Sequence, residues 1–500
     1  MFYPFAMSQT LNGNGNGVTT TVPAPLPQRP LTNKEAHVTF PSADGTTMRG
    51  SLVSMSRHSV AFEFYSPGVV LTNSEVLEKF SVNVQGESIY LGRAVICSLV
   101  DVGTKTLCEA TLDETLWRKA DSPSLSRRDG QIANEFKDFL KGWQKFYIVA
   151  PEFKVAVADL ETFLRDLQLW LNQSELKIKL SPKLQTDRHE LEIVAQLAEA
   201  AIPAIDMLFE KFESVANGIS GQQRAAHASY MRQHLHPLVL CTPFANRTFE
   251  KPRGYAGDYE MVNMIIRNGF EGDSLFAKIL HAWFVNQPPA KAHRNRIKYL
   301  AGNIARESFR ATRASRAARI FNFACGPAAE IQEFIQTQPF PIHIDFTLAD
   351  FEEQTLEFIQ RSLRKHHGPA QSNLKLNYRK MSVLQLIKEH RRVNDSEAGQ
   401  FDLVYCAGLF DYLPDNSCKQ LMNIFYEMLA PGGLLIATNV EPSNPLRYGM
   451  EYLLDWHLIY RNDTQMRDIR PDAADKTDVC IRTDATGVNL FLEVRKPDHG

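Results

Sequence analysis

The chain has 500 residues, of which 44% are hydrophobic and 22% are charged, and its formal net charge is −2. A chain of this length exceeds what one hydrophobic core can organise, so several domains are expected. The composition is that of a globular protein, and the small net charge excludes a strong electrostatic attraction to nucleic acid or to an anionic membrane.

The seven cysteines follow no metal-ligand spacing, and several of them lie inside apolar stretches. This usage is typical of small buried side chains in a reducing compartment, so we expect no metal site. The first residues lack the basic and apolar segments of a secretory signal, and no window reaches the roughly 18 apolar residues of a membrane span. We therefore expect a cytoplasmic protein with no membrane span and no nucleic-acid partner.

Residues 1–35 have the composition of a disordered tail, because Asn-Gly repeats and prolines cannot build a packed core. Residues 36–118 then form short apolar or alternating runs that glycines separate. This spacing predicts a small antiparallel β-barrel. The expected strands are 37–40, 48–53, 59–64, 80–84, 89–98 and 105–112.

The order of these strands resembles a PilZ domain, the bacterial receptor module for cyclic di-GMP. In that family a strand carries D-x-S-x-x-G, and a preceding R-x-x-x-R arm binds phosphates through charge-assisted hydrogen bonds. The comparable residues 54–59 keep only Ser56, and Arg29 stands alone before them. The barrel is therefore degenerate, which argues against cyclic di-GMP binding and favours a role in assembly or domain contact.

Residues 119–130 are polar and rich in turn-forming residues, as in a linker. In residues 131–310 the hydrophobic period becomes that of helices, with apolar stripes at 132–146, 155–171 and 188–217. Three histidines follow without the spacing of a metal site, and contact with a substrate stays open for them. They are His227, His234 and His236.

A segment of different character occupies residues 251–259, Lys-Pro-Arg-Gly-Tyr-Ala-Gly-Asp-Tyr. Its cations, glycines, aromatic rings and carboxylate suit close contact with a ligand. An equally good interpretation is a turn in which Asp258 caps the helix 259–267. The basic stretches 293–298 and 306–319 are typical of solvated helix faces.

The C-terminal domain, residues 311–500, opens with the strand 320–323, a turn of small residues at 325–329 and the helix 330–336. Strands and helices alternate after it, which predicts a parallel sheet with right-handed crossovers. The last two strands are joined by a short turn and are expected to form a hairpin at the sheet edge. The expected later strands are 342–349, 374–378, 401–406, 434–438, 478–483 and 488–494, and the expected later helices are 352–365, 384–389 and 416–429.

Asp350 follows the second of these strands, about 20 residues beyond the turn, where a carboxylate can accept both hydroxyls of a ribose. A dehydrogenase shares that feature, but it lacks Pro431-Gly432-Gly433 before a fifth strand and the closing hairpin. As a set, these features resemble the class I S-adenosylmethionine-dependent methyltransferases over residues 315–497. The resemblance implies a Rossmann-like α/β fold, with S-adenosyl-L-methionine as the cofactor.

The resemblance also implies which residues contact the cofactor. Two departures stand in the turn, because the family usually has an acid at Asn322 and glycines at Ala324 and Ala328. The implied contacts come from the turn, the ribose carboxylate and the ends of the third and fourth strands. They are Ala324, Cys325, Gly326, Asp350, Phe351, Ser382, Val383, Cys406, Ala407 and Gly408.

A narrower resemblance spans residues 190–497. Residues 251–260, the Cys-Gly-Pro-Ala turn and residues 447–461 look like bacterial methyltransferases that make 3-hydroxypalmitic acid methyl ester, a quorum signal. This resemblance implies O-methylation of a small or lipid-like acceptor, such as a hydroxy fatty acid carboxylate. We expect the 251–259 segment to close over the cofactor, with Arg253 and Tyr255 in contact with it.

Methyl transfer is an in-line displacement, and the enzyme's main task is to hold nucleophile and methyl about 3 Å apart in a dry site. A carboxylate nucleophile is already ionised, whereas a hydroxyl or amine benefits from a general base. Arg253 or Arg447 is expected to pair with an acidic substrate. The candidate catalytic residues are Tyr255, Asp258, Glu441 and Arg447, with Asp411 and His457 as further candidate bases.

Two other functions stay open. A non-catalytic signalling protein would combine a degenerate sensor barrel with a domain that only binds adenosylmethionine, and the imperfect turn motivates this alternative. An NAD-dependent oxidoreductase would share the strand-turn-helix opening, but the Pro-Gly-Gly segment and the closing hairpin speak against it. The sequence also leaves the oligomeric state open, a homodimer included.

Overall fold

The computed structural model describes residues 36–41, 47–64, 71–84, 87–101, 106–113, 149–179, 187–337, 343–365, 374–392 and 399–498. The predicted tail 1–35, the linker 119–130 and the helical stripe 132–146 lie outside these ranges. Within the described ranges, no helix is both long enough and apolar enough to cross a lipid bilayer.

The first domain is a closed barrel of antiparallel strands in the order β1-β2-β3-β6-β5-β4. Side chains that alternate along the strands fill its interior, and the rings of Phe40, Phe62 and Phe80 pack together there. The predicted barrel is confirmed. Its strands are β1 (Ala36–Pro41), β2 (Thr47–Met55), β3 (Ser59–Phe64), β4 (Val76–Val84), β5 (Glu87–Asp101) and β6 (Thr106–Leu112).

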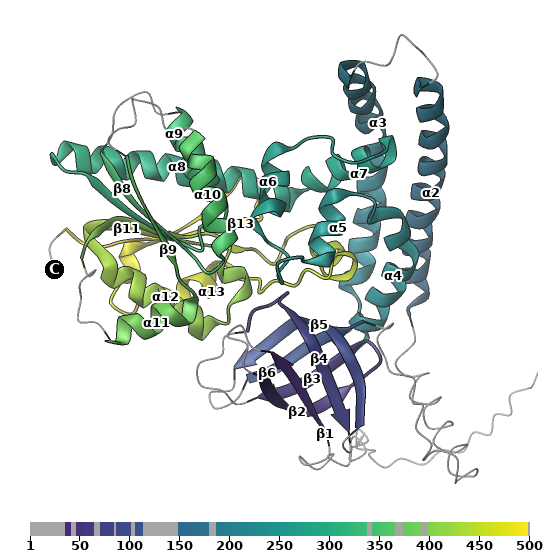
Figure 1. The fold of residues 1–500 in the computed structure, drawn as a ribbon, viewed down its shortest axis with the longest axis horizontal. Coiled ribbons are helices and arrows are strands. Elements are labelled where there is room, and N and C mark those ends of the chain that lie inside the picture. Colours follow the sequence, from purple (N-terminus) through teal and green to yellow (C-terminus); the bar gives the residue numbers. More distant parts are fainter. Residues whose placement is uncertain are drawn as a thin grey trace, which may run out of the picture.

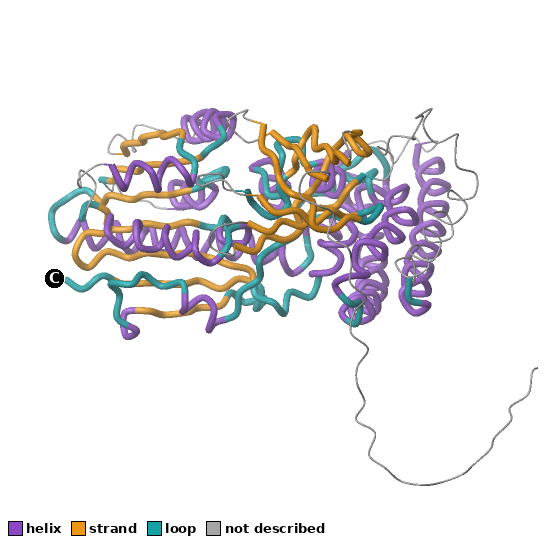
Figure 2. The backbone as a smooth tube through the Cα atoms, turned by 90° about the horizontal axis from the view of Figure 1, so that it is seen from below, coloured by secondary structure: helices purple, strands orange, loops and turns teal. Residues whose placement is uncertain are grey.

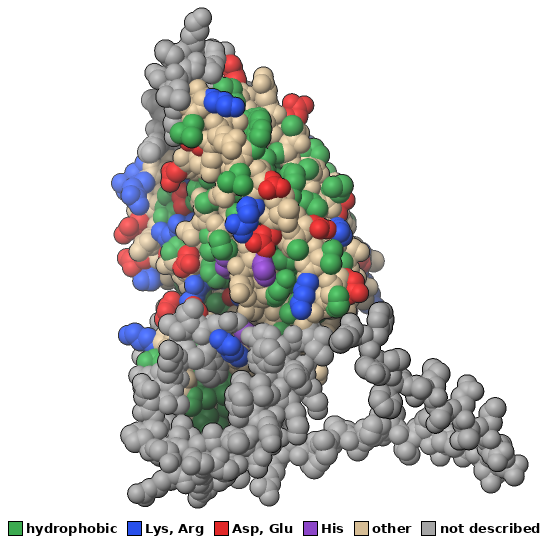
Figure 3. All heavy atoms as spheres, turned by 90° about the vertical axis from the view of Figure 1, so that its right-hand side faces the viewer, with side chains coloured by type: hydrophobic (Ala, Val, Ile, Leu, Met, Phe, Trp, Pro, Cys, Tyr) green, Lys and Arg blue, Asp and Glu red, His purple; other side chains and the backbone are tan. Residues whose placement is uncertain are grey.

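The second part of the chain is helical, and two long helices, α2 and α3, stand side by side in it (Figure 1). Side-chain caps start the short helices, with Thr242 before α5, Asp258 before α6 and Ser274 before α7. Apolar, basic and acidic side chains mix across the visible described part of its outer face (Figure 3). The helices are α2 (Pro151–Lys179), α3 (Asp187–Asn217), α4 (Arg224–Val239), α5 (Pro243–Glu250), α6 (Tyr259–Arg267), α7 (Leu275–Val285) and α8 (Pro288–Arg313).

The third part is a seven-stranded sheet in the order β12-β13-β11-β10-β7-β8-β9. All neighbours are parallel except β13, which runs antiparallel to both β11 and β12. The strands are β7 (Ala318–Phe323), β8 (Ile344–Asp350), β9 (Leu374–Lys380), β10 (Phe401–Cys406), β11 (Leu429–Val440), β12 (Val479–Thr483) and β13 (Asn489–Arg495). The helices are α9 (Ala329–Thr337), α10 (Glu353–Lys365), α11 (Val383–Arg392), α12 (Asp415–Met428) and α13 (Asp463–Asp468).

Helices cover both faces of this sheet, because its strands are apolar on both sides. Side chains from α8, α9 and α10 pack on one face, and those from α11, α12 and α13 pack on the other (Figure 1). The strand order and the antiparallel β13 are those of the class I methyltransferase fold, so the predicted fold class is confirmed. One detail differs: β11 already starts at Leu429 and includes the Pro-Gly-Gly segment, with Gly432 at φ 69°.

The direction of the strand order reverses between β7 and β10. In open α/β sheets, ligands bind at such a switch point, beyond the carboxyl ends of the strands. Those ends face the helical domain, and the barrel lies against the junction of the two (Figures 1 and 2). The π-helical turn Gly449–Leu453 strengthens the junction, since it comes after the sheet strand β11 but packs in the core of the helical domain.

Candidate active site

The turn after β7 has an unusual backbone. Ala324, Gly326 and Ala328 all have positive φ, at 56°, 50° and 50°. A left-handed conformation costs roughly 1–2 kcal/mol for a residue with a Cβ. The turn therefore keeps the conformation that suits glycine even where alanines replace the expected glycines. At Gly326 a Cβ would meet no other atom within 4 Å, so the backbone is open to a ligand on that side.

Asp350, at the end of β8, is tied to this turn. Its Oδ2 accepts a hydrogen bond of 3.1 Å from the N–H of Gly326, and its Oδ1 accepts one of 3.0 Å from the N–H of Glu352. Burial raises the pKa of Asp350 to about 6, although these hydrogen bonds oppose that shift. A buried carboxyl group that still has free lone pairs is well suited to accept the hydroxyls of a ligand.

The segment before α6 covers the connection between β8 and α10. Arg253 Nε lies 2.7 Å from a carboxylate oxygen of Glu352, and the hydroxyl of Tyr255 donates to the other at 2.9 Å. The ring of Tyr255 also lies 5.4 Å from the ring of Phe351, which is 52% exposed. The segment is thus held over the end of β8 by an ion pair, a hydrogen bond and a ring contact.

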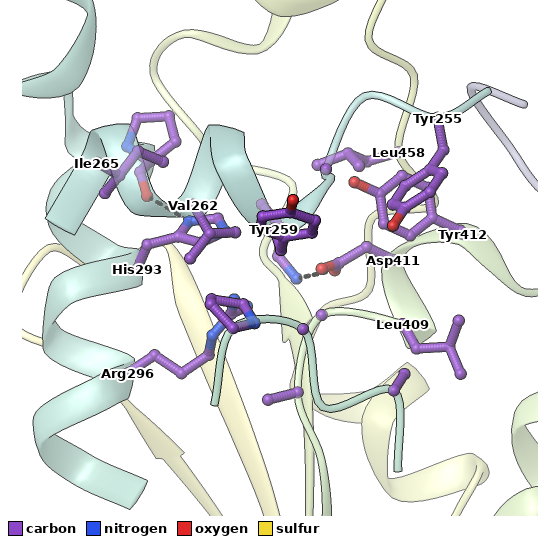
Figure 4. Close-up of a pocket in the computed structure, with 18 of the residues that line it drawn as sticks. Tyr255, Tyr259, Val262, Ile265, His293, Arg296, Leu409, Asp411, Tyr412 and Leu458 are labelled. Atoms are coloured by element: carbon purple, nitrogen blue, oxygen red, sulfur yellow. Dashed lines mark hydrogen bonds between the residues drawn. The ribbon is translucent and has the colours of Figure 1, made fainter. Parts of the chain in front are cut away.

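A cavity of about 530 Å³ lies between these elements. Figure 4 shows side chains of α6 and α8 on one side of it, and Asp411, Tyr412 and Leu458 on the other. Of the predicted site residues, eleven border this cavity, which brings the turn, Asp350 and the end of β10 together. They are Arg253, Tyr255, Ala324, Cys325, Gly326, Asp350, Phe351, Ser382, Val383, Ala407 and Gly408.

Four predicted site residues, all within the described ranges, do not border the cavity: Cys406, Asp258, Glu441 and Arg447. Cys406 is buried inside the sheet. Asp258 caps α6 and accepts two hydrogen bonds from Arg247, at 2.9 and 2.7 Å. These contacts match the interpretation of Asp258 as a helix cap.

Glu441 and Arg447 have partners of their own. Glu441 accepts a hydrogen bond of 2.6 Å from the N–H of Ser443, and Arg447 donates to Glu451 at 2.9 Å. Among the candidate bases, Asp411 does border the cavity, and burial raises its pKa to about 6. His457 hydrogen bonds to Asp455 at 2.9 Å and does not border this cavity.

Arg296 is the main cavity residue that the sequence did not identify. It lies on α8 in the basic stretch 293–298, for which a solvated helix face was predicted, and that prediction is wrong here because its side chain is only 8% exposed. Its Nη1 has no hydrogen-bond partner in the described part of the chain. The same atom lies 3.1 Å from the position that a Cβ would take on Gly408, so the guanidinium sits beside the end of β10.

The charge of Arg296 is poorly compensated. Burial lowers its pKa, and the attraction of the nearby carboxyl groups of Asp411 and Glu330 does not fully offset that cost. Such a buried, unpartnered cation is unfavourable unless a ligand supplies an anion. His293 projects from the same helix toward the cavity (Figure 4), with its Nδ1 hydrogen bonded to the carbonyl of Pro289 at 3.0 Å.

Glu330 is the second cavity residue that was missed. It sits in the first turn of α9, and its Oε1 accepts hydrogen bonds from Asn322 Nδ2 at 2.9 Å and from the hydroxyl of Tyr405 at 2.8 Å. Burial raises its pKa. A carboxyl group therefore borders the cavity beside Asn322, the position where the family usually has an acid.

No protein-family model matches this chain, and no curated protein matches it. Among solved structures, a possible exported protein from Bordetella parapertussis is 15% identical with a TM-score of 0.37, covering 60% of this chain and 97% of its own. Magnesium protoporphyrin IX methyltransferase from Synechocystis PCC 6803, with bound SAH, is 11% identical with a TM-score of 0.32. That match covers 47% of this chain and 93% of the methyltransferase. N-methyltransferase NodS from Bradyrhizobium japonicum, in complex with S-adenosyl-L-homocysteine, is 19% identical with a TM-score of 0.28. That match covers 42% of this chain and 89% of NodS. Likeness this low carries no conclusion about ligands, so the class I methyltransferase fold of this chain rests on its own strand order.

Proposed function

We propose that the protein binds S-adenosyl-L-methionine at the β7–α9 turn and transfers its methyl group to an apolar acceptor. The observation that carries the proposal is a cavity at the switch point of a class I methyltransferase sheet, bordered by the turn, by Asp350 and by Gly408. The open side of Gly326 and the orphaned Nη1 of Arg296 both fit a ligand that carries an amino-acid group. When bound, the cofactor supplies an electrophilic methyl group on a sulfonium.

The nucleoside half of the cofactor fits the end of β8. The carboxylate of Asp350 would accept the ribose hydroxyls, since its two hydrogen bonds to backbone N–H groups leave lone pairs free. Phe351 and Tyr255 form an aromatic pair at which an adenine ring can stack. Ser382 and Val383 follow the neighbouring strand β9 and border the same cavity.

The amino-acid half fits the charges between β7 and β10. Arg296 would pair with the α-carboxylate, and Glu330 would accept from the α-ammonium. In this arrangement the acid that the family usually carries at the Asn322 position is supplied from α9 instead. Arg253 and Arg447, the cations predicted to pair with an acidic substrate, already pair with Glu352 and Glu451.

The remaining wall of the cavity is mostly apolar and suits a lipid-like acceptor such as a hydroxy fatty acid. Its side chains come from α6, α7, α8 and the segment after β11. They include Val262, Ile265, Phe284, Ile297, Leu446, Met450, Trp456 and Leu458. An acceptor carboxylate needs no base, whereas a hydroxyl nucleophile would find Asp411 as the cavity carboxyl group next to the end of β10.

Calorimetry with S-adenosylhomocysteine tests the cofactor, and transfer of tritium from labelled S-adenosylmethionine tests the reaction. We expect saturable 1:1 binding, and label transfer to 3-hydroxydodecanoate, a soluble representative of the acceptor class. Absence of binding would refute the proposal. Binding without transfer to any acceptor in a broad set of hydroxy acids, fatty acids and amines would instead favour the non-catalytic signalling function.

Tyr255 provides a test of the covering segment. Tyr255→Ala removes both the hydrogen bond to Glu352 and the ring contact with Phe351, which together amount to roughly 1–3 kcal/mol. We expect a comparable loss in the free energy of S-adenosylhomocysteine binding, measured by calorimetry, and slower turnover. Tyr255→Phe keeps the ring and serves as the matched control, with a loss below about 1.5 kcal/mol. Wild-type affinity and turnover in Tyr255→Ala would show that the segment does not cover the cofactor.

A further inference from the structure

Residues of the barrel domain form part of the cavity wall. Thr72 and Glu75, just before β4, and Val76, its first residue, line the cavity together with residues of the sheet and helical domains. No motif in the barrel predicted such a role, and the sequence favoured only assembly or domain contact. The barrel segment therefore forms part of the same enclosure as the proposed cofactor and acceptor sites.

Hydrogen bonds hold this segment in place. The N–H of Val76 donates to the carbonyl of Gly254 at 2.7 Å, and the N–H of Asn73 donates to the carbonyl of Tyr412 at 3.2 Å. The fully buried hydroxyl of Ser74 accepts from the N–H of His457 at 2.6 Å and donates to its carbonyl at 2.9 Å. These bonds join the barrel to the covering segment, to the loop after β10 and to the segment after β11.

Two further contacts flank the segment. Arg93 Nη2 donates to the carbonyl of Phe249 at 2.7 Å, and the hydroxyl of Thr111 donates to Asp455 at 3.1 Å. These contacts come from strands β5 and β6, so the barrel is attached to the rest of the protein through these strands as well as through the segment at the start of β4. A barrel fixed in this way can present a side chain to a ligand with a defined geometry.

Glu75 is the side chain so presented. Its Oε2 accepts from the N–H of Thr72 at 2.7 Å and from the hydroxyl of Thr72 at 3.0 Å. Glu75 borders the cavity, and its Oε1 accepts no hydrogen bond from the described part of the chain. Burial raises the pKa of Glu75 to about 7, so a hydrogen-bond donor that arrives at Oε1 would stabilise the ionised form.

We propose that the barrel forms a wall of the acceptor site and that Glu75 determines specificity by accepting a hydrogen bond from a hydroxyl group on the apolar acceptor. The inference rests on the proposed methyl transfer. Asn73 contacts Tyr412, the residue after Asp411, so the barrel segment lies near the end of β10 where the reaction is proposed. A hydroxyl group on such an acceptor can donate a hydrogen bond to the carboxylate of Glu75.

Glu75→Gln tests the role directly. The amide oxygen can still accept from Thr72 and keep the turn, while the group facing the cavity changes from an acceptor to a donor. At pH 8, above the pKa of Glu75, we expect kcat/KM for 3-hydroxydodecanoate to fall about tenfold or more, with dodecanoate within about twofold. Glu78→Gln, which changes an exposed carboxylate of β4, should leave both acceptors unaffected.

Calorimetry with S-adenosylhomocysteine on each variant separates the possible failures. Unchanged cofactor binding with the selective loss supports the inference. An equal effect on both acids, or no effect on either, would overturn the role of Glu75 while leaving the proposed function intact. A wild-type protein that binds S-adenosylhomocysteine but methylates neither acid would overturn the acceptor assigned to Glu75. A wild-type protein that does not bind it would refute the proposed function itself.

Discussion

Arg296→Met is expected to stabilise the ligand-free protein and, at the same time, to weaken S-adenosylhomocysteine binding about 10- to 150-fold, the equivalent of 1.5–3 kcal/mol for a hydrogen-bonded charge. The guanidinium is buried and its Nη1 has no hydrogen-bond partner in the described part of the chain. Desolvation of this charge therefore lowers the free energy of unfolding of the ligand-free protein. Methionine fills similar space without that charge, and we expect the free energy of unfolding to rise by about 1–3 kcal/mol. Thermal denaturation and calorimetry measure the two effects.

The same substitution at Arg294 is the matched control. Arg294 lies on the same helix, and its guanidinium donates to the carbonyls of Ile265 and Val285 and to the side chain of Asn286, at 3.0, 2.6 and 3.2 Å. Arg294→Met leaves buried acceptors without a donor, so it should lower stability while cofactor affinity stays unchanged. If both variants destabilise the ligand-free protein to the same degree, Arg296 is a structural residue.

A smaller ligand identifies which group Arg296 binds. 5′-Methylthioadenosine has the nucleoside and the sulfur of the cofactor but lacks its amino-acid group. Arg296→Met should therefore leave the affinity for methylthioadenosine within about twofold of wild type while it weakens S-adenosylhomocysteine binding. An equal loss for both ligands would contradict the assignment of the α-carboxylate to Arg296.

The fold was readable from the sequence because its signals are local. Asp350 after the second strand, Pro431-Gly432-Gly433 and the two closing strands each act over a few residues, and together they leave one sheet topology. The glycine turn was readable for the same reason, although Ala324 and Ala328 adopt left-handed conformations that alanine disfavours. The structure around them enforces a conformation that their own preference would not select.

The missed residues have long-range causes. Arg296 belongs to a basic helical stretch, and only the packing of α8 between the helical domain and the sheet decides which of its side chains is buried. Glu330 compensates for Asn322 across a turn, so comparison with the family at Asn322 alone finds only a missing acid. The hydrogen bonds between Ser74 and His457 join residues 383 apart in sequence, and no local pattern predicts them.

Asp350→Asn is expected to weaken S-adenosylhomocysteine and methylthioadenosine equally, by about 1.5–3 kcal/mol, because both ligands carry the ribose hydroxyls that a charged carboxylate would accept. Calorimetry with the two ligands therefore distinguishes this variant from Arg296→Met, which should affect only the first. Asp345→Asn is the control, since Asp345 lies at the other end of β8 and pairs with the exposed Lys375 at 3.2 Å. Wild-type affinity in Asp350→Asn would mean that the ribose binds elsewhere.

The pH dependence gives an independent test of the same carboxyl group. Burial raises the pKa of Asp350 from 3.8 to about 6, so the folded protein without ligand holds this proton more tightly than the unfolded chain does. Asp350 therefore contributes stability below about pH 4 that is lost as the pH rises through 6, and Asp350→Asn should remove that part of the pH dependence.

The affinity for the ligand should depend on pH in the opposite direction, because ribose hydroxyls favour the ionised carboxylate of Asp350. Affinity for methylthioadenosine, which avoids Arg296 and Glu330, should fall as the pH drops below 6 in the wild type. The decrease should be smaller in Asp350→Asn, and identical profiles would exclude Asp350 as the ribose acceptor.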